Sequence, residues 1–402
     1  MSTLKVDAIR HNSATSDAIT TAADGTCTAR VTGMTGGGGL SNRNIIINGD
    51  FKIAQHGTSS TISGYGTVDR FETTIDTGDS NVMTQTHNTL SSSDTPYSLG
   101  FRKSFKLTNH SSGQSADAAD YAALRHIIEA SDIANSGWNY TSSSSNITLS
   151  FWVKASVSQN YLLQVRSYDG TAKRISFLVN LTAGQWTKVT KTIPGDSGIT
   201  VNNDNGGGLH ILWIVYYGSN YVSGSTTDVW QSGTPSPVFP TTWYTTASST
   251  FEITGVQLEV GDTATSFEFR NFGDELLRCQ RYYYKLGRLD YISQHMSASE
   301  IYGIGMSDND NTNIYAMINF PVSMRVPPTA IEQTGSAGDY RVRRDTTQTC
   351  SSAPQFIDAA NHYCRVNFIK SGHGWGTGQM LWCMSGGSSS YLGFDAELKY
   401  NS

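Results

Sequence analysis

The stretch Phe251-Glu-Ile-Thr-Gly-Val-Gln-Leu-Glu-Val260 decides the fold, because apolar and polar residues alternate along it with the period of a β-strand. The alternation slips by one residue at Gly255, which is consistent with a β-bulge. A second stretch, Leu149-Ser-Phe-Trp-Val-Lys154, alternates strictly, so that its odd-numbered residues share one face. Both stretches therefore predict strands that bury one face in a core.

Many further short stretches show strand patterns separated by polar turns. Before residue 270 the predicted strands are Asp69–Thr74, Val82–Thr86, Phe101–Leu107, Tyr161–Tyr168, Ile175–Asn180, Trp186–Ile193 and Leu209–Tyr217. After residue 285 they are Tyr302–Met306, Asn313–Phe320, Tyr363–Ile369, Leu381–Met384 and Gly393–Tyr400. Residues Asp274–Tyr284 instead predict a short helix, which Asn271 or Asp274 can cap. The pattern indicates two sandwich-type β domains joined by a connector helix.

The composition excludes several classes of protein. Of the 402 residues only 15% are charged, while 20 Tyr, 15 Phe and 8 Trp supply large apolar surfaces for a folded core. The net charge of -5 provides no basic field for nucleic acid. The longest apolar run, Leu209–Tyr217, is too short to cross a bilayer, and the N-terminus lacks the apolar core of a signal peptide. We therefore expect a protein made in a cytoplasm, without nucleic-acid binding or membrane insertion.

The cysteines do not indicate a disulfide framework or a metal site. They are odd in number, and no two of them form a CxxC pair. The five are Cys27, Cys279, Cys350, Cys364 and Cys383. We predict that all are reduced side chains that fill packing space.

The first 43 residues differ from the rest of the chain. Short strand patterns in this segment contain the apolar residues Leu4, Val6, Ile9 and Ile19. A flexible hinge is predicted at the glycines Gly36, Gly37, Gly38 and Gly39. A segment this short and polar cannot bury a core of its own. We therefore expect it to dock onto a partner, to intertwine with copies of itself, or to pack on the next domain.

Several stretches together resemble known families. The stretches Asn44-Ile-Ile-Ile-Asn-Gly-Asp-Phe51, Ile147-Thr-Leu-Ser-Phe-Trp-Val-Lys-Ala155 and Phe251–Asp262 resemble the first, middle and last strands of jelly-roll carbohydrate-binding modules. The segment Asp274–Lys285 resembles one that is common in bacteriophage tail and fibre proteins. The opening Met1–Ile9 is similar to the start of structural proteins of marine phages.

The resemblance spans residues 1–12 and 44–285 and implies a tail-fibre protein of a marine short-tailed bacteriophage. It implies a homotrimer in the tail of the virion, bound to tail adaptor, nozzle or portal-associated proteins and meeting a glycan of the host surface. It also implies a strand at Leu124–Glu129 and a helical turn at Ser131–Asn135, where the residues alone also allow a helix. The expected all-β chain comprises a virion-anchoring segment at 1–43, a jelly roll at 44–270, a connector helix at 271–285 and a C-terminal β-sandwich tip domain at 286–402.

Aromatic residues in polar loops are the candidate ligand-binding residues. Aromatic rings can stack on the apolar faces of sugar rings, while polar neighbours bind hydroxyl groups. One group follows the strand Leu209–Tyr217, and a second lies in the glycine-rich loop Ser371–Gly376. The candidate glycan-binding residues are Tyr217, Tyr221, Trp230, Trp243, His373 and Trp375. Burial in the core or at a subunit interface is the alternative for the tryptophans.

Catalytic chemistry is not expected from this sequence. No GxSxG, HExxH or P-loop motif occurs. Glu252 and Glu259 are seven residues apart, so an unbulged strand would place them on opposite faces as solvated residues. The resemblance to carbohydrate-binding jelly rolls implies no cofactor beyond a structural calcium ion, for which Asp50 is the candidate ligand.

Three other functions stay open at this point. The chain fits a head fibre or horn of the capsid, which also needs an anchor and an outward module. It fits a purely structural tail component without a receptor. It also fits a free carbohydrate-binding module of a polysaccharide-degrading system, although that function predicts a monomer, a signal peptide and a catalytic partner domain.

Overall fold

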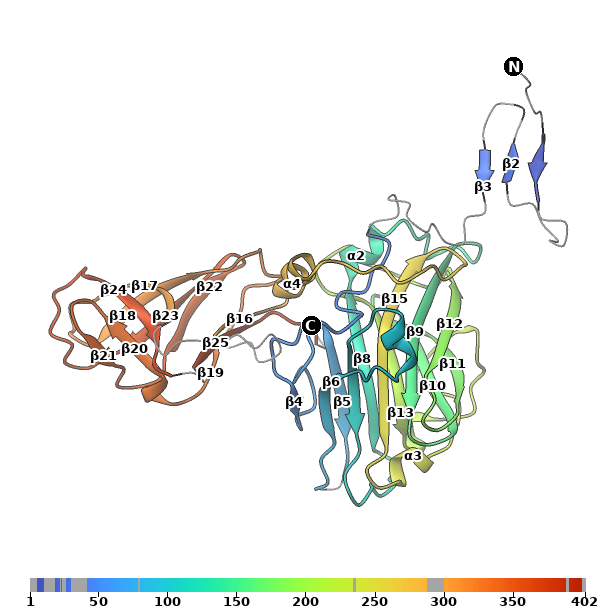
Figure 1. The fold of residues 1–402 in the computed structure, drawn as a ribbon, viewed down its shortest axis with the longest axis horizontal. Helices are drawn as coiled ribbons and strands as arrows, with labels where there is room; N and C mark the ends of the chain where they lie inside the picture. The colour runs from blue at the N-terminus through green and yellow to red at the C-terminus, as the bar shows by residue number, and fades with distance from the viewer. Residues whose placement is uncertain are drawn as a thin grey trace.

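The computed structural model describes residues 6–10, 19–21, 23, 27–29, 42–78, 80–233, 236–287, 300–387 and 390–399. In this part of the chain most regular structure is β-strand, arranged as a small N-terminal sheet, a large sandwich and a smaller sandwich (Figure 1). The prediction of an all-β chain is therefore confirmed.

The large sandwich consists of two antiparallel six-stranded sheets. Sheet I has the order β14 (Trp230–Ser232), β11 (Lys173–Leu181), β10 (Gln159–Ser167), β13 (Gly207–Tyr217), β8 (Tyr121–Glu129) and β5 (Phe71–Asp76). Sheet II has the order β12 (Thr187–Pro194), β9 (Asn146–Ala155), β15 (Thr250–Val260), β7 (Lys103–Thr108), β6 (Thr84–Thr89) and β4 (Ser59–Ser60). The chain changes sheet after every one to two strands along most of its path, which wraps it around one core as a jelly roll. The connections carry α1 (Thr95–Ser98), α2 (Ala130–Ala134), the 3-10 turn η1 (Ser219–Tyr221) and α3 (Thr242–Thr245).

The core lies between the two sheets, where the alternating residues of facing strands meet. Phe151 and Val153 of β9 and Ile253 of β15 are each at most 1% exposed. Trp213 of β13 enters the same core, and its ring lies edge-on to that of Phe151 at a centroid distance of 5.6 Å. The strand faces predicted from alternation are therefore confirmed.

The bulge predicted at Gly255 is present and changes the faces of β15. Gly255 has a φ of 63°, and β15 carries one extra residue here against β9. Because of this residue, Glu252 and Glu259 lie on the same outer face of sheet II, so the expectation of opposite, solvated positions is wrong. Each is 3% exposed, with Glu252 accepting a hydrogen bond from Asn88 (2.7 Å) and Glu259 from the Thr265 amide (2.8 Å).

A helix connects the two sandwiches, but it is shorter than the sequence predicts. Helix α4 (Phe272–Gln280) begins after Asn271, whose Oδ1 accepts the Asp274 amide at 2.9 Å as a cap. It ends before Tyr283, because residues Tyr283–Gly287 form strand β16 against a segment about a hundred residues away. That partner is not visible in the local pattern. No helix in the described part of the chain is long and apolar enough to span a bilayer.

The smaller sandwich pairs a three-stranded sheet with a seven-stranded one. The smaller sheet has the order β16, β25 (Tyr391–Asp395) and β19 (Glu332–Gln333). The larger has the order β21 (Thr347–Thr349), β20 (Tyr340–Arg343), β24 (Met380–Ser385), β17 (Ile301–Ser307), β18 (Asn313–Asn319), β23 (Tyr363–Ile369) and β22 (Gln355–Ala360), with the 3-10 turn η3 (Ala337–Asp339) before β20. The strand predicted to reach Tyr400 ends at Asp395, since residues 396–398 leave the sheet and return to the jelly roll.

A buried junction joins the two sandwiches. The Arg70 guanidinium, 1% exposed, pairs with Glu397 and lies 3.5 Å from the centre of the Tyr282 ring. Glu129 of β8 accepts the Tyr282 hydroxyl at 2.7 Å and Nε of Arg281 at 3.0 Å. Arg281 and Tyr282, which follow α4 directly, thus build this junction. The chain enters the C-terminal domain at this junction and returns to it, since Leu398 packs in one buried cluster with Ile47 and Ile127 of the jelly roll (Figure 1).

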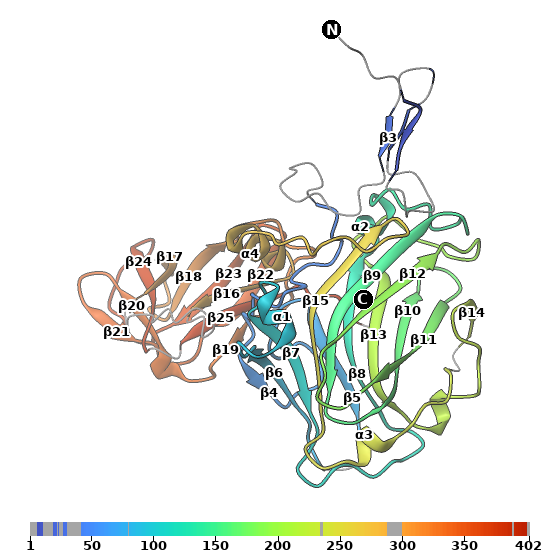
Figure 2. The same cartoon turned by 45° about the vertical axis from the view of Figure 1, so that its right-hand side comes forward.

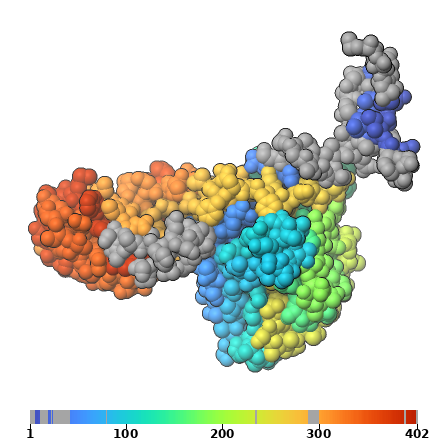
Figure 3. Space-filling model, viewed as in Figure 1, coloured from blue at the N-terminus to red at the C-terminus, as the bar shows by residue number. Residues whose placement is uncertain are grey.

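The N-terminal strands β1 (Ala8–Ile9), β2 (Ile19–Thr21) and β3 (Cys27–Ala29) form a separate antiparallel sheet. It stands away from the jelly roll in both ribbon views and projects from the bulk of the molecule in the space-filling view (Figures 1, 2 and 3). Two side chains of the predicted anchor are exposed, Val6 by 42% and Ile9 by 53%. Ile19 lies in β2. Outside the described residues lie Leu4 and the predicted hinge of Gly36, Gly37, Gly38 and Gly39.

Four cysteines have described side chains, and all four are free and buried. They are Cys279, Cys350, Cys364 and Cys383. Burial raises the pKa of each thiol, which keeps it in the unreactive protonated form. The prediction of reduced packing residues is confirmed for these four.

Candidate functional site

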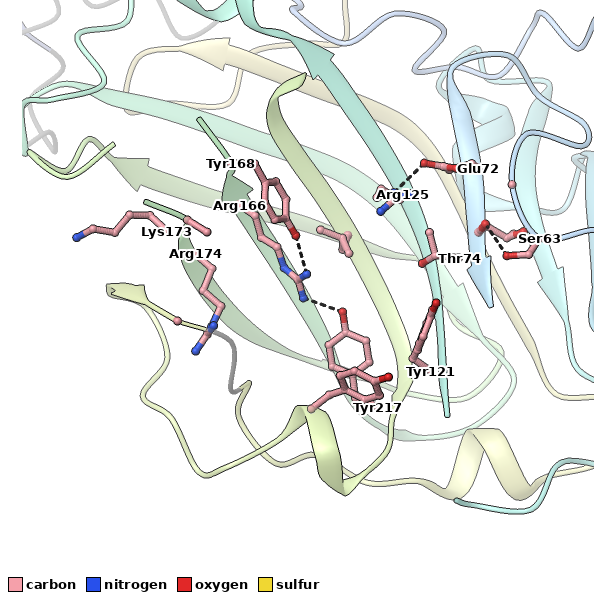
Figure 4. A pocket seen from close by; sticks show the side chains of 16 residues that line it. Ser63, Glu72, Thr74, Tyr121, Arg125, Arg166, Tyr168, Lys173, Arg174 and Tyr217 are labelled. Atoms are coloured by element: carbon pink, nitrogen blue, oxygen red, sulfur yellow. Dashed lines mark hydrogen bonds and ion pairs between the residues drawn. The ribbon is translucent and has the colours of Figure 1, made fainter. Parts of the chain in front are cut away.

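A pocket of about 520 Å³ opens on the outer face of sheet I, the face turned away from sheet II (Figure 4). This volume is in the ordinary range for sites that hold small molecules or parts of larger ligands. Strands β5, β8, β10, β11 and β13 all supply lining residues. A site built on strands holds its side chains more firmly than one built on loops.

The pocket lies where the polar part of this face begins. Beside it the outer face is apolar, and Leu162 and Ile214 pack there under Phe239 from the connection between η1 and α3. Leu212 belongs to this cluster and also lines the pocket. The connection therefore covers the apolar half of the face and leaves the polar half open.

Tyrosine rings line the pocket at two places. Tyr121 of β8, Tyr217 of β13 and Tyr221 of η1 lie together at one end. The ring centroids of Tyr217 and Tyr221 are 5.4 Å apart, and Tyr121 meets Tyr221 edge-on at 5.5 Å. Tyr168, just past the end of β10, lines the opposite part (Figure 4). The rings offer flat apolar surfaces with hydroxyl groups at their edges.

Two ion pairs stand at the borders of the pocket. Arg125 of β8 donates through Nε to Glu72 of β5 at 2.7 Å. Lys173, at the start of β11, pairs with Asp196 at 2.8 Å. Glu72 is the one carboxylate among the lining residues, and Arg125 neutralises it.

Arg166 occupies the centre of the pocket and is held by neutral groups. Its Nη1 donates to the Tyr168 hydroxyl at 2.9 Å and its Nη2 to the Tyr217 hydroxyl at 2.7 Å (Figure 4). Its Nε donates to the side-chain oxygen of Gln164 at 2.9 Å. Within the described ranges Arg166 forms no ion pair with a carboxylate. These bonds fix the planar guanidinium in one orientation.

The positive charge of Arg166 contributes to lowering the pKa of two neighbouring groups. Arg174 of β11 lies directly opposite Arg166 in the antiparallel register. Burial, and then the charge of Arg166, lower the pKa of Arg174. Burial, followed by the charges of Arg125 and Arg166, lowers the pKa of His210 well below its usual value, so this imidazole is neutral at neutral pH.

Two of the predicted ligand-binding residues lie in this pocket. Tyr217 and Tyr221 are 51 and 55 positions from Arg166 in sequence, yet all three line the same cavity. Their role in binding a glycan stays a prediction.

The two tryptophans predicted from the following loop lie elsewhere. Trp243 is 0% exposed, belongs to the jelly-roll core and donates through Nε1 to the Thr250 carbonyl at 3.0 Å. Trp230, at the start of β14, is half-buried against that core and donates to the Pro194 carbonyl at 2.7 Å. Neither lines the pocket. The prediction that they bind a ligand in this site is wrong, and the alternative of burial in the core holds, because the loop folds back and packs both indoles against the sandwich.

The second predicted group, in the C-terminal domain, is also packed inward. His373 is 3% exposed, and its ring stacks on that of Trp375 at 5.3 Å. Its Nδ1 accepts the Trp375 amide at 3.0 Å, which closes the loop on itself. Trp375 is half-buried against the core of the domain. The glycines of this loop let the two rings fold inward, so His373 is buried and does not offer its ring to a glycan as predicted.

The predicted calcium ligand, Asp50, is ion-paired instead. Its carboxylate lies 2.8 Å from Nζ of Lys52, which also donates to the Arg270 carbonyl at 2.6 Å. Among the described residues, no three His, Cys, Asp or Glu side chains converge as a metal site. A lysine ammonium therefore holds the place that the cation would need, and the calcium prediction lacks support.

Sequence reasoning missed the charged residues of the pocket. Arg166 and Tyr168 both fall on the polar face of the predicted strand Tyr161–Tyr168, which was a readable signal. The sequence signal for Arg125 and Arg174 was weaker, because each lies among mostly apolar residues. Their proximity depends on the strand order of sheet I, which the sequence does not specify.

Comparisons with known proteins give structural neighbours at low identity. No family model matches the chain, and no curated protein matches it. The chain is similar to a family 11 carbohydrate-binding module from Clostridium thermocellum, with 9% identity, 52% of this chain and 98% of that chain covered and a TM-score of 0.26. It is also similar to a putative sugar binding protein from Bacteroides thetaiotaomicron (12%, 54% and 100% covered, TM-score 0.27) and to a cyclase from Fischerella sp. (11%, 56% and 97% covered, TM-score 0.30). The jelly-roll fold rests on the strand order above, and the ligand must be argued from the side chains.

Proposed function

We propose that this chain is a bacteriophage tail-fibre protein whose jelly-roll domain binds a glycan of the host cell surface in the pocket on sheet I. The observation that carries the proposal is this pocket, in which tyrosine rings and hydrogen-bonding groups converge on a rigid sheet. No catalytic role is assigned to the chain.

The chemistry of the lining suits a sugar. A pyranose ring has apolar faces that pack on aromatic rings and a rim of hydroxyl groups that need donors and acceptors. Tyr121, Tyr217 and Tyr221 supply the rings, while Arg166 and the Arg125–Glu72 pair supply oriented polar groups. A few fixed polar groups among apolar surfaces are typical of small-ligand sites.

The tyrosines of the pocket provide the test of glycan binding. On a glycan array with neutral, amino and acidic sugars, we expect the wild-type chain to bind and Tyr121→Ala to lose about tenfold or more in affinity, which corresponds to about 1.4 kcal/mol. Tyr121→Phe keeps the ring and should bind like the wild type.

The control is an exposed aromatic residue outside the pocket. Phe272 is 39% exposed at the start of α4, so Phe272→Ala should leave glycan binding unchanged. Loss of binding in Phe272→Ala together with normal binding in Tyr121→Ala would place the site outside the pocket and contradict the proposal.

The N-terminal sheet supports the proposed position of this chain in the virion. Val6, just before β1, and Ile9 of β1 expose apolar side chains at a small sheet that stands away from the jelly roll. These side chains support docking of this segment onto a tail adaptor, nozzle or portal-associated protein. A head fibre of the capsid, a structural tail component and a free carbohydrate-binding module are the alternatives. Antibody labelling of particles of a marine short-tailed phage distinguishes a tail position from a capsid position and from absence.

The proposal includes a homotrimer, which an exposed apolar sheet face supports. On the seven-stranded sheet, Ile304 pairs with Trp382 and Met306 with Met380, and these four side chains are 44–65% exposed. Met317 of β18 is also 52% exposed. A contiguous apolar face of this kind on a soluble protein usually marks an interface.

Light scattering provides the test of self-association. We expect a native mass three times that of the single chain, and we expect Ile304→Asp to shift the protein to the monomer by placing a charge on this face. Val238 is 63% exposed on the jelly roll, so Val238→Asp is the matched control and should remain trimeric. A monomeric wild type in solution would contradict the homotrimer and favour a free carbohydrate-binding module.

A further inference from the structure

Resting on the proposed function, we propose that the pocket on sheet I selects acidic glycans, with Arg166 and Arg174 binding a carboxylate or sulfate group on a pyranose ring. The proposal concerns the class of ligand and its charge, and it makes these two arginines the residues that determine specificity.

The placement of the two arginines is the first argument. Arg166 of β10 and Arg174 of β11 are direct partners in the antiparallel register, so both side chains stand on the same face of sheet I. Like charges directly opposite each other on a sheet are destabilising. An anion bound between the two guanidinium groups would convert this repulsion into two charge-assisted contacts.

The orientation of Arg166 is the second argument. Tyr168, Tyr217 and Gln164 hold its guanidinium through neutral oxygen atoms, so its full positive charge remains in the pocket. The Tyr217 oxygen accepts from Arg166, which directs the hydroxyl proton elsewhere and makes it a donor for a ligand oxygen. A cation that is oriented before binding loses little conformational entropy when it meets a planar carboxylate.

The charge balance of the lining is the third argument. Four cations line the pocket, Arg125, Arg166, Lys173 and Arg174. Arg125 pairs with Glu72 and Lys173 with Asp196, whereas Arg166 forms no ion pair with a carboxylate of the described residues. The whole chain has a net charge of -5, so this pocket is a cationic place on an acidic protein. The pocket therefore attracts an anionic group of its ligand, which favours an acidic sugar over a neutral one.

The experiment compares matched glycans on the wild-type chain. The probes are polygalacturonate, the same polymer with its carboxyl groups reduced to alcohols, dextran sulfate, dextran and a single-stranded oligonucleotide, each measured by affinity electrophoresis or calorimetry. We expect binding to at least one acidic polymer, at least tenfold weaker binding to its neutral counterpart, and a loss of affinity between 50 and 500 mM salt. Preference for polygalacturonate assigns a carboxylate, and preference for dextran sulfate assigns a sulfate ester.

A variant tests the arginines directly. Arg174→Gln should weaken binding of the acidic polymer at least tenfold and leave any binding of the neutral one unchanged. Lys188 is exposed on the edge strand β12 of sheet II, so Lys188→Gln removes the same charge outside the pocket and should bind normally. If Arg174→Gln does not fold, two measurements still test the proposal. One is the comparison of acidic and neutral polymers on the wild-type chain. The other is Arg166→Lys, which keeps the positive charge but loses the planar guanidinium.

The outcomes separate this inference from the proposed function. Equal binding of acidic and neutral partners overturns the acidic-glycan inference and leaves glycan binding intact. Tighter binding of the oligonucleotide than of any glycan overturns both. Absence of binding to every glycan of the array and to both acidic polymers also overturns both.

Discussion

Replacing Glu397 by glutamine is expected to lower the free energy of unfolding by about 3–5 kcal/mol, because it leaves the buried charge of Arg70 without its partner. Arg70 is 1% exposed, and its remaining contacts are the Ile127 carbonyl at 2.6 Å and the face of the Tyr282 ring. None of these carries a negative charge. Urea denaturation followed by tryptophan fluorescence measures the change.

A double variant separates the ion pair from simple loss of packing. Glu397→Gln combined with Arg70→Met removes both charges from the junction, so the double variant should be less destabilised than the sum of the two single changes. The expected coupling is at least about 1 kcal/mol. Additive effects would mean that the pair does not hold the junction of the two sandwiches.

Replacing Gly49 by alanine is the second change with a large expected effect. A Cβ at this position would lie 2.0 Å from the carbonyl oxygen of Val256, which is backbone and cannot rotate away. The Gly49 carbonyl also accepts the Val256 amide at 2.8 Å, so the two chains cannot separate without losing a buried hydrogen bond. We expect a loss of about 3 kcal/mol or more in the free energy of unfolding.

Gly78 provides the control for this prediction. An added Cβ there meets its nearest atom at 3.7 Å, an ordinary contact, so Gly78→Ala should change stability by no more than about 0.5 kcal/mol. Both variants are compared with the wild type by chemical denaturation. Equal stability of Gly49→Ala and the wild type would contradict the close approach of the segment around Gly49 to β15.

The sequence motif around Gly49 has a structural role that only the tertiary structure reveals. Asn48 has a φ of 62°, and its side chain bonds both backbone groups of Ile53 and the carbonyl of Asp69. Phe51 then enters the core beside Phe71 at a centroid distance of 4.7 Å. The motif is a sharp turn that pins the first segment of the jelly roll, and this explains why Asn, Gly and Phe stand together.

Some features could be predicted because their signals are local. The alternation in β9 and β15 indicated their buried faces, since side chains of a strand alternate with a period of two. The single glycine at Gly255 marked the bulge, and Asn271 marked the start of α4. Each of these signals lies within a few residues of the structure that it specifies.

Other features could not be predicted because they depend on distant partners. The sequence pattern of Tyr283 and Tyr284 continued the helix, but strand β25 draws both residues into a sheet. Trp243 follows a polar loop, yet the core takes up its indole. In both cases burial of a large apolar surface outweighs the local preference.

The sequence by itself indicated many of the strands, the buried faces of β9 and β15, the bulge in β15 and the start of α4, whereas strands β19 to β22 were not predicted. Only the tertiary structure decided that Arg166 meets Tyr217, 51 residues away, and that Arg70 meets Glu397, 327 residues away. The physical reason is that alternation indicates which face of a strand is polar, but the order of strands in a sheet decides which polar residues become neighbours. The candidate site consists entirely of such neighbours.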